Sequence, residues 1–516
     1  MQNFNLPGSS PPKYGFQKSE NTRAEVTIYQ HGDDPIVLQT KKATDPTRLI
    51  GNRPTDTEAS VISVNTTKDI NNASGTFEIT VKPSRVSIDL FKRLTDDDWV
   101  DITFYVNTTP YHNFRGLIDG VAENITVNNG ATSITYIISG RCFGKIWEST
   151  PIWFSPYYND IITAALSSRV FNGIPEFFGA PDKVAIAFLK GFLEAVESND
   201  GVNWLPPKNM PGIIGNSFLN NVNFNESVLG GSTLFQNVPK REEFNANAIA
   251  PEGVLWDLAK TYSDPTFTEL YTDYLPDGDP LSSKLNGSIS TGDAQMTVVM
   301  RDRPFPVLPI SAPPSYKNTW DTLPEFVIQP QEIVSKSVSR GGYERYNAFF
   351  AASRIHQESI ERYALNLLSP LIDRQSIKRH GFRRFDVQSN VQPSADNPVI
   401  DGGTNLDTLC NYQRQIARDW YCLNPYLLSR TIGLGHGRPD IRIGCKLIEK
   451  GFAINSKETA IDTTYYVESV TNAWTFGMGV RTTIGVTRGW LGDSDSYNTA
   501  LAKIASRYDI VPLESV

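Results

Sequence analysis

The C-terminal part of the chain alternates hydrophobic and polar residues in a way that predicts a β-hairpin. Val470, Asn472, Trp474 and Phe476 fall on one face of an extended strand, and the residues between them fall on the other. Alternation of aromatic and β-branched residues is typical of a half-buried strand. The Gly-Met-Gly sequence at 477–479 then predicts a turn, because glycine accepts the positive φ that hairpin turns need.

A hairpin of the same design lies much earlier in the chain, with a turn at Asn128-Asn129-Gly130. The two align without a gap, matching Val121, Ile125, Val127 and Gly130 with Val470, Trp474, Phe476 and Gly479. The strands opening at Asp101-Ile102 and at Asp440-Ile441 correspond as well. Upstream, 61–65 and 76–81 correspond to 333–338 and 347–351. We therefore predict that one β unit occurs twice, although any two amphipathic hairpins share some likeness.

The predicted fold is mainly β with α+β insertions. It has two similar antiparallel, tube-like β-barrel domains and an inserted α+β domain. A chain of 516 residues is too long for one core. In chain order we expect an extended N-terminal arm (1–23), the first barrel (24–150), the α+β domain (151–280), the first part of the second barrel (281–352), a helical and loop insertion (353–436), the last part of the second barrel (437–490) and a C-terminal helix and tail (491–516).

Turn residues and periodicity place the individual elements. Strands are expected at Glu25–Tyr29, Val61–Val64, Thr76–Val81, Val100–Val106, Phe114–Glu123, Ile134–Ile138, Met296–Met300 and Ile441–Leu447, and within 326–352. Helices are expected at Asp160–Phe171, Asp182–Glu197, Pro251–Tyr262, Glu358–Leu368, Leu406–Leu423 and Asn498–Tyr508.

Two segments are candidates for contacts with other chains. Residues 1–20 are rich in Pro, Gly, Ser and Asn, which predicts an arm that either frays or docks on a neighbour. Residues 198–247 form a long Gly-, Asn- and Pro-rich stretch, and loops of that length are uncommon unless they contact something.

Charge and composition exclude several classes of protein. The formal net charge of −8 argues against a nucleic-acid reader, which normally has a basic face. We find no membrane-length apolar run and no secretory signal at the N-terminus. We therefore expect a reducing compartment. Cys142, Cys410, Cys422 and Cys445, which form no C-x-x-C pair, are interpreted as buried apolar residues.

Two carboxylate clusters are the only candidates for acid/base catalysis. Asp96-Asp97-Asp98 and Glu242-Glu243 resemble in composition the acid pair of a glycosidase. Consecutive acids on a loop are usually just solvated, and that is our interpretation. The sequence has no H-E-x-x-H, G-x-S-x-G or phosphate-loop motif.

The remaining candidate sites also have simpler interpretations. Residues 273–280 carry three aspartates that suggest a calcium loop, but turns use aspartate as well. The glycines of 433–437 suggest a nucleotide loop, but Arg438-Pro439 follows and a turn fits better. Lys378-Arg379-His380 with Arg383-Arg384 fits a phosphate backbone less well than a solvated face or an acidic protein partner.

The five histidines are His31, His112, His356, His380 and His436, and their spacing is not that of metal ligands. We therefore predict no catalytic, cofactor-binding or metal-binding residues, and no cofactor.

Taken together, the motifs resemble a known family over roughly 23–490. The first unit ends in Gly116–Val127 and Ile134–Arg141, a strand ends in Arg301-Asp302-Arg303-Pro304-Phe305-Pro306, and the second unit ends in Tyr465–Phe476 and Arg481–Gly489. This pattern resembles the baseplate hub of contractile-tailed, Mu-like bacteriophages and, more distantly, the N-terminal part of the type VI secretion spike. One departure is Cys142, which follows Arg141 where many relatives carry an acidic residue.

The resemblance implies a structural role rather than an enzyme. It implies a homotrimer whose six similar barrels form a pseudo-six-fold ring between a hexameric tail tube and a trimeric central spike. It implies contacts with baseplate wedge proteins and the tape measure protein, DNA only in transit through the channel, and no membrane integration. The expected location is the tail baseplate of a virion assembled in the host cytoplasm. The alternative is a tail-associated enzyme that degrades cell-wall glycans.

Overall fold

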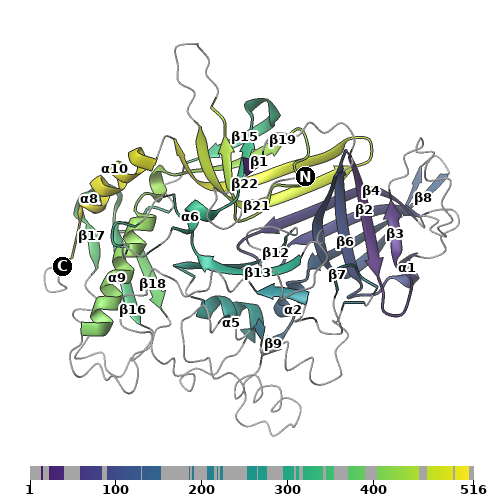
Figure 1. The fold of residues 1–516 in the computed structure, drawn as a ribbon, viewed down its shortest axis with the longest axis horizontal. Helices are drawn as coiled ribbons and strands as arrows, with labels where there is room; N and C mark the ends of the chain where they lie inside the picture. Colours follow the sequence, from purple (N-terminus) through teal and green to yellow (C-terminus); the bar gives the residue numbers. More distant parts are fainter. Residues whose placement is uncertain are drawn as a thin grey trace, which may run out of the picture.

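The structure is a computed structural model of the 516-residue chain. It describes residues 13–14, 22–39, 59–83, 90–107, 109–128, 131–152, 253–263, 265–275, 295–306, 318–340, 344–353, 370–389, 404–451, 462–491 and 494–510, with a few positions in 185–224 and 309–316. Figure 1 shows a β-barrel on the right, a second set of strands above it and a mixed α/β part on the left. The mainly β fold with α+β insertions is confirmed.

The first β unit closes into a barrel. Its strands are β2 (Thr22–Tyr29), β3 (Ile36–Gln39), β4 (Ala59–Asp69), β5 (Thr76–Pro83), β6 (Trp99–Val106), β7 (Thr109–Asn128) and β8 (Ala131–Cys142), and helix α1 (Leu90–Arg93) precedes β6. In the described residues they pair in the ring β2-β3-β4-β5-β8-β7-β6-β2, antiparallel except for β3–β4. Val26, Ile79 and Trp99 are fully buried in its core. All six strands expected here from the sequence are present, and β3 is additional.

The second β unit repeats five of these strands in the same order. They are β15 (Ile333–Ser339), β19 (Leu428–Leu434), β22 (Gly479–Leu491), β21 (Thr463–Thr475) and β20 (Lys446–Glu449). Each pairs antiparallel with the next, as β4, β5, β8, β7 and β6 do in the barrel. The units differ at the following strand, because β14 (Glu325–Ile328) pairs with β20 in parallel, whereas β2 and β6 are antiparallel.

Two β-bulges occur at equivalent positions in both units. The β7–β8 ladder skips Asp119, and the β21–β22 ladder skips Glu468. The ladder of β4 with β5 skips Ile62, and that of β15 with β19 skips Val334. The first coincidence falls where the ungapped alignment of the hairpins places it, and the second falls within the matched segments 61–65 and 333–338. A bulge inserts one extra residue at a defined point of a ladder, so its position records the register. The predicted duplication therefore holds for the strand order and these two bulges, while the second unit has further register breaks at Ser429 and Tyr465.

One matched pair of segments was wrong. Residues 347–351 do not correspond to β5, whose counterpart by pairing is β19. They belong to β16 (Ala348–Ser353), in which Ala348, Phe349 and Ala351 are buried. Because adjacent residues point to opposite faces, such a strand is covered on both sides. It lies in a sheet of its own, within the segment that separates β15 from β19.

That sheet and its helices form the left-hand part of Figure 1. The elements are β17 (Leu371–Asp373), α8 (Arg374–His380), β18 (Arg384–Ser389), α9 (Thr404–Tyr421), α10 (Ser494–Ala505) and β23 (Tyr508–Ile510), with the short helix η8 (Asn424–Tyr426) before β19. The described strand order is β18-β16-β17-β23. Trp420 of α9 stacks on Phe305 with ring centroids 4.8 Å apart, and Tyr497 of α10 lies in the same core. The expected insertion and C-terminal helix therefore share one core.

A three-stranded sheet forms the centre of the molecule. β12 (Thr268–Leu275) and β13 (Gln295–Asp302) pair antiparallel, and β10 (Val222–Phe224) joins β13 in parallel. Helices α2 (Lys145–Glu148) and α5 (Leu255–Tyr262) and the short strands β9 (Pro151–Ile152) and β11 (Gly253–Val254) lie beside it. The expected domain boundary at residue 280 falls inside the β12–β13 pair, so β13 is not part of the second β unit.

Several expected elements differ in detail. The strand expected at Ile441–Leu447 begins only at Lys446, because the chain turns at Gly444, which has a φ of +72°. The expected helix starts at Leu255 rather than Pro251, and the last helix, expected at 498–508, is α10 at 494–505. The helices expected at 160–171 and 358–368 lie outside the described residues. Of 182–197, residues 185, 189 and 190 are described, and they are helical.

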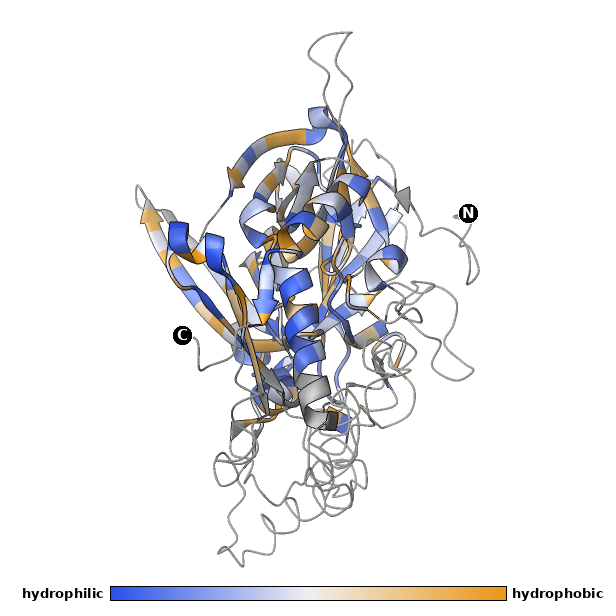
Figure 2. Cartoon of the chain, turned by 90° about the vertical axis from the view of Figure 1, so that its left-hand side faces the viewer, coloured by the Kyte–Doolittle hydropathy of each residue, from blue (hydrophilic) through white to orange (hydrophobic). Residues whose placement is uncertain are grey.

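The strands show the alternation from which they were predicted, visible as orange and blue bands in Figure 2. Val470, Asn472 and Trp474 are buried as expected, but Phe476, at the edge of the turn, is exposed. The N-terminal arm contributes β1 (Lys13–Tyr14), which pairs with β14 of its own chain. The short helices α6 (Thr319–Thr322) and η6 (Pro330–Glu332) flank β14. In the described residues, no helix has both the length and the apolarity needed to span a membrane.

A buried charged cluster joins the central sheet to the second β unit. Arg301 Nε of β13 donates to Glu269 Oε1 of β12 at 2.6 Å, and its Nη2 donates to the carbonyl of Gly444 at 2.7 Å. Tyr466 of β21 donates its hydroxyl proton to the same Glu269 oxygen at 2.6 Å. Although burial alone would lower the pKa of Arg301, Tyr271 and Glu269 raise it well above its ordinary value. The guanidinium is therefore charged, and the carboxylate depends on it.

Arg301→Met should destabilise the protein strongly, because it leaves the Glu269 carboxylate buried without its cation. We expect a loss of about 3–5 kcal/mol in the free energy of unfolding. The matched control is Arg384→Ala, which removes an exposed ion pair with Asp386 and should cost less than about 1 kcal/mol. Urea unfolding followed by tryptophan fluorescence measures both. Equal effects of the two substitutions would contradict the structural role of Arg301.

Candidate functional site

The three consecutive aspartates before β6 form a turn. The carboxylate of Asp98 is buried and accepts hydrogen bonds from Thr95 N at 2.8 Å, Thr95 Oγ1 at 3.0 Å and Gln30 Nε2 at 2.7 Å. Asp97 has a φ of +68°, and its carboxylate binds Lys145 Nζ at 2.6 Å. These two acids thus hold the turn in place. The other candidate pair, Glu242-Glu243, lies outside the described residues.

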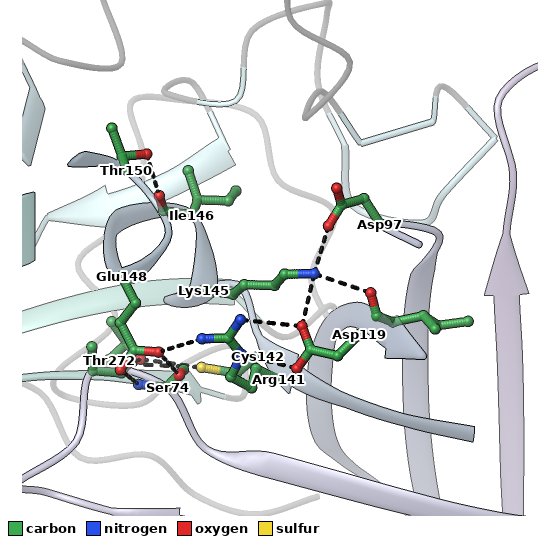
Figure 3. Close-up of polar contacts among 12 residues, drawn as sticks. Ser74, Asp97, Asp119, Arg141, Cys142, Lys145, Ile146, Glu148, Thr150 and Thr272 are labelled. Atoms are coloured by element: carbon green, nitrogen blue, oxygen red, sulfur yellow. Dashed lines mark hydrogen bonds and ion pairs between the residues drawn. The ribbon is translucent and has the colours of Figure 1, made fainter. Parts of the chain in front are cut away.

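Asp97 belongs to a polar cluster at the point where the chain leaves the barrel (Figure 3). Lys145 Nζ of α2 also lies 2.8 Å from Asp119 Oδ1, at the bulge of β7. Arg141 Nε of β8 donates to Asp119 Oδ2 at 2.9 Å, and its Nη1 donates to Glu148 Oε2 at 3.2 Å. The cluster therefore connects the bulge of β7, the end of β8 and helix α2, where the inserted segment starts. We call these residues (Asp97, Asp119, Arg141, Lys145 and Glu148) the clamp.

The nucleophiles beside this clamp are engaged or protonated. Ser74 donates its amide proton to Glu148 Oε1 at 3.2 Å, and its hydroxyl bonds to the same carboxylate. Cys142 Sγ lies 3.4 Å from Thr272 Oγ1. Burial raises the pKa of the Cys142 thiol, and only the thiolate is a good nucleophile. Cys142, Cys422 and Cys445 are buried, as expected, whereas the side chain of Cys410 lies outside the described part of the chain.

The carboxyl groups with shifted pKa values do not suit a glycosidase. Although burial alone would raise the pKa of Asp119, hydrogen bonds from Arg141 and Lys145 hold it below its usual value. A hydrogen bond from Lys450 likewise lowers the pKa of Asp462. A glycosidase needs a general acid with a raised pKa. These acids therefore give no support to the glycan-degrading alternative.

The other candidate residues do not come together in one site among the residues that the structure describes. Asp273 lies in β12 and forms an ion pair with Lys68, so it is not part of a turn. Gly433 lies within β19, and the chain bends only from Gly435 onward. The described histidines lie in no group of three or more potential metal ligands, and the described residues contain no such group. His356 is outside the described residues.

The basic cluster lies at the exposed end of α8. Lys378, Arg379 and His380 form its last turn, and Arg383 and Arg384 follow, all of them exposed. Arg384 pairs with Asp386 at 2.6 Å. A solvated face agrees with this placement, and an acidic protein partner remains a proposal.

The two β units are joined by a continuous backbone ladder between β4 and β21. Seven consecutive residue pairs, from Ser469 with Asp69 to Thr475 with Ser63, are in antiparallel register. The ladder continues at its ends, because Phe476 N donates to Ile62 O at 2.9 Å and Ile70 N donates to Glu468 O at 2.9 Å. Sheets that join in this way pair the strand edges that would otherwise be open.

Side chains reinforce this joint on both faces of the sheet. Thr67 Oγ1 and Thr471 Oγ1 lie 3.1 Å apart across the ladder. On the other face, Trp474 and Val480 of the second unit belong to the hydrophobic core of the first barrel. The hairpin β21–β22 of the second unit thus contributes side chains to the core of the first barrel. Figure 1 shows the hairpin running toward that barrel.

Within the part of the chain that the structure describes, the edges of β7 and β15 that correspond to the paired edges of β21 and β4 are open. In the described residues, β7 beyond Ile118 pairs with β8 alone, and β15 pairs with β19 alone. Both strands expose large apolar side chains: Ile125 and Val127 of β7 are 58% and 65% exposed, and Val334 and Val338 of β15 are 75% and 50% exposed. By contrast, Trp474, the counterpart of Ile125, is 3% exposed.

Sequence reasoning identified these strands but not their open edges. The alternation of Val121, Ile125 and Val127 predicts a half-buried strand in the same way as that of Val470 and Trp474. The two hairpins differ in whether a further strand pairs with their first strand, and local sequence does not show this because it depends on tertiary structure.

Comparisons with known proteins find similar proteins among solved structures. No protein-family model and no curated protein sequence matches this chain. A tail protein from Neisseria meningitidis is 11% identical, with a TM-score of 0.44, covering 90% of this chain and 96% of its own. A 43 kDa tail protein of a Shewanella oneidensis prophage is 9% identical, with a TM-score of 0.42, covering 90% and 98%.

A third similar structure is an Escherichia coli component of the type VI secretion system, itself similar to tail proteins of bacteriophage T4. It is 8% identical, with a TM-score of 0.37, covering 83% of this chain and 73% of its own. The expected resemblance to tail and type VI spike proteins is therefore found among solved structures. At these identities, no residue role is carried over to this chain.

Asp119 should contribute to stability in a pH-dependent way. Because its pKa is lowered on folding, its contribution is present above the unfolded-state pKa of about 3.9 and is lost as pH falls through the folded-state value. Asp119→Asn should therefore reduce the loss of stability between about pH 5 and pH 2. The urea midpoint across this range measures the effect. Arg141→Gln should have the same effect, and a double variant whose losses simply add would contradict the coupling.

Proposed function

We propose that this chain is the structural hub of a phage tail baseplate. Three copies form a pseudo-six-fold ring that joins the hexameric tail tube to the trimeric central spike and lines the channel through which DNA leaves. The observation that carries the proposal is the internal repeat: two units in one chain have the same order of five strands and the same two bulges. A duplicated unit lets a three-fold assembly present six near-equivalent surfaces.

The parts outside the repeat supply the three-fold contacts. The central sheet and the α/β part built from the segment after β15 and the C-terminus occur once per chain, so three copies present them three times. In this function, the ring contacts the tube protein on one side and the spike on the other, with wedge and tape measure proteins as further partners. The location is the virion tail baseplate, assembled in the host cytoplasm, without membrane integration.

The net charge of −8 suits a channel through which DNA passes without binding. Like charges on the wall and on the phosphate backbone repel each other, so the wall does not trap the nucleic acid. The role of DNA is thus that of a molecule in transit.

Native mass measurement of the full chain at several concentrations tests the ring. We expect a species of three chain masses that grows with concentration and resists moderate salt, because backbone pairing and apolar contacts hold the copies together. A chain that stays monomeric at the highest soluble concentration would overturn the hub proposal. A stable dimer would contradict the three-fold symmetry.

The enzymatic alternative predicts a different outcome. It predicts that purified cell wall incubated with the full chain releases soluble sugar, whereas the hub proposal predicts no more release than buffer gives. If release occurs, Asp97→Asn and Asp119→Asn tell whether the clamp is responsible. Release that either substitution abolishes would establish catalysis there.

A further inference from the structure

The joint between β4 and β21 contains the information needed to pair the two open edges. Strand β21 corresponds to β7 through the shared bulges at Glu468 and Asp119, and β4 corresponds to β15 through those at Ile62 and Val334. In the described residues, the first unit thus has an open edge on β7, the counterpart of β21, and the second unit has an open edge on β15, the counterpart of β4. The two edges differ from each other, so each is complementary to its opposite and not to itself.

We infer that β15 of one copy pairs antiparallel with residues 122–127 of β7 in the next copy, in the register of the joint inside the chain. Transferring the observed pairs one by one gives the register. The pair Ala473–Asn65 becomes Asn124–Ser337, Thr471–Thr67 becomes Ala122–Ser339, Trp474–Val64 becomes Ile125–Lys336, and Asn472–Thr66 becomes Glu123–Val338. This inference specifies the contact on which the proposed ring rests.

Burial supports the transfer position by position. Val64 and Thr66 of β4 are buried under β21, whereas their counterparts Lys336 and Val338 on β15 are exposed. Asn472 of β21 is buried, whereas its counterpart Glu123 is exposed. Residues that are buried at the joint inside the chain are therefore exposed at the equivalent positions of the open strands.

The exposed side chains are also complementary in character. Ile125 takes the position of Trp474, which inserts into the core of the neighbouring barrel, so an apolar side chain stands where the joint needs one. Glu123 and Lys336 lie diagonally across the inferred ladder on the same face, where opposite charges attract, and Lys336 also forms an ion pair with Glu449 of its own chain. Val127 and Val334 stand where Phe476 N donates to Ile62 O, at the end of the ladder.

The geometry makes the contact head-to-tail. The free edges belong to different units, and in Figure 1 β8, the partner of β7, reaches the right-hand margin while β15 and β19 lie at the top, left of the barrel. A head-to-tail contact closes into a ring when the rotation per copy divides a full turn. First and second units alternate around such a ring. Every contact between neighbouring units therefore pairs a strand of a first unit with a strand of a second unit.

Paired cysteines test the register in the full-length chain. Asn124→Cys and Ser337→Cys are chosen because their counterparts Ala473 and Asn65 lie in a non-hydrogen-bonded pair, where side chains are closest. Chains carrying only one of the two substitutions are mixed and exposed to a mild oxidant. We expect dimers that disappear with reductant, and chains carrying both substitutions should give a ladder of larger species.

The matched control replaces Ser337→Cys by Lys336→Cys, which points to the other face of the strand and should give little cross-linking with Asn124→Cys. A single variant that cross-links to itself would indicate a two-fold contact and overturn the inference. Equal cross-linking by both pairs would overturn the register. A multi-chain species without the cross-link would overturn the inference and leave the hub proposal standing. Cross-linked species that are not trimers would support the strand pairing and overturn the hub proposal.

A second measurement does not depend on disulfide chemistry. Ile125→Asp should weaken self-association at least about tenfold, because it puts a charge where the joint inserts an apolar side chain. Ile510→Asp is the control, since Ile510 of β23 is also exposed but lies in the α/β part of the chain. An unchanged association with Ile125→Asp, or an equal loss with both, would overturn the inference. A chain that never associates would overturn both the pairing and the ring.

Discussion

The backbone ladder between β4 and β21 is the contact on which the arrangement of this protein depends. Each residue of a strand carries a donor and an acceptor that must be paired when buried, so a strand in the middle of a sheet needs a neighbour on each side. Strand β4 has β5 on one side and, beyond Ser60, β21 on the other. The second unit therefore completes the sheet of the first, and the two units share one sheet instead of standing apart.

Buried arginines fix the rest of the molecule to this pair of units. Arg301 bridges the central sheet and β21 through Glu269 and Gly444. Arg115 of β7 donates to both carboxylate oxygens of Asp101 at 2.7 and 2.6 Å and to the carbonyl of Pro211 at 3.1 Å. Each guanidinium uses several donors at once toward different elements, which a lysine could not do in the same planar geometry. Removing one of these groups would leave its buried partner uncompensated, so the charged clusters specify how the elements fit together.

Much of this fold was readable from the sequence. Alternation gave the strands of the barrel and the hairpin at 463–491, and the ungapped alignment of 121–130 with 470–479 gave the repeat. Extended two residues upstream, that alignment matches the bulge at Asp119 with the bulge at Glu468. The counterpart of β5 was missed because the segment after β15 contains β16, an apolar strand that alone looks as suitable as β19. The open edges could not be read at all, since Ile125 and Trp474 have the same local pattern and differ only in what covers them.

The way the two units differ shows which part of the duplicated fold is constrained. Strands β4 and β5 are joined by a short turn, whereas β15 and β19 are separated by the whole segment that contains β16, β17, β18 and α9. Lengthening a connection costs little, because the entropy of closing a loop grows only slowly with its length. Losing a bulge would shift the register by one residue and turn every later side chain of that strand to the other face. The two units therefore differ at their connections and agree in strand order and in the bulges at Asp119 and Glu468, and the bulge at Glu468 lies where β21 begins to pair with β4.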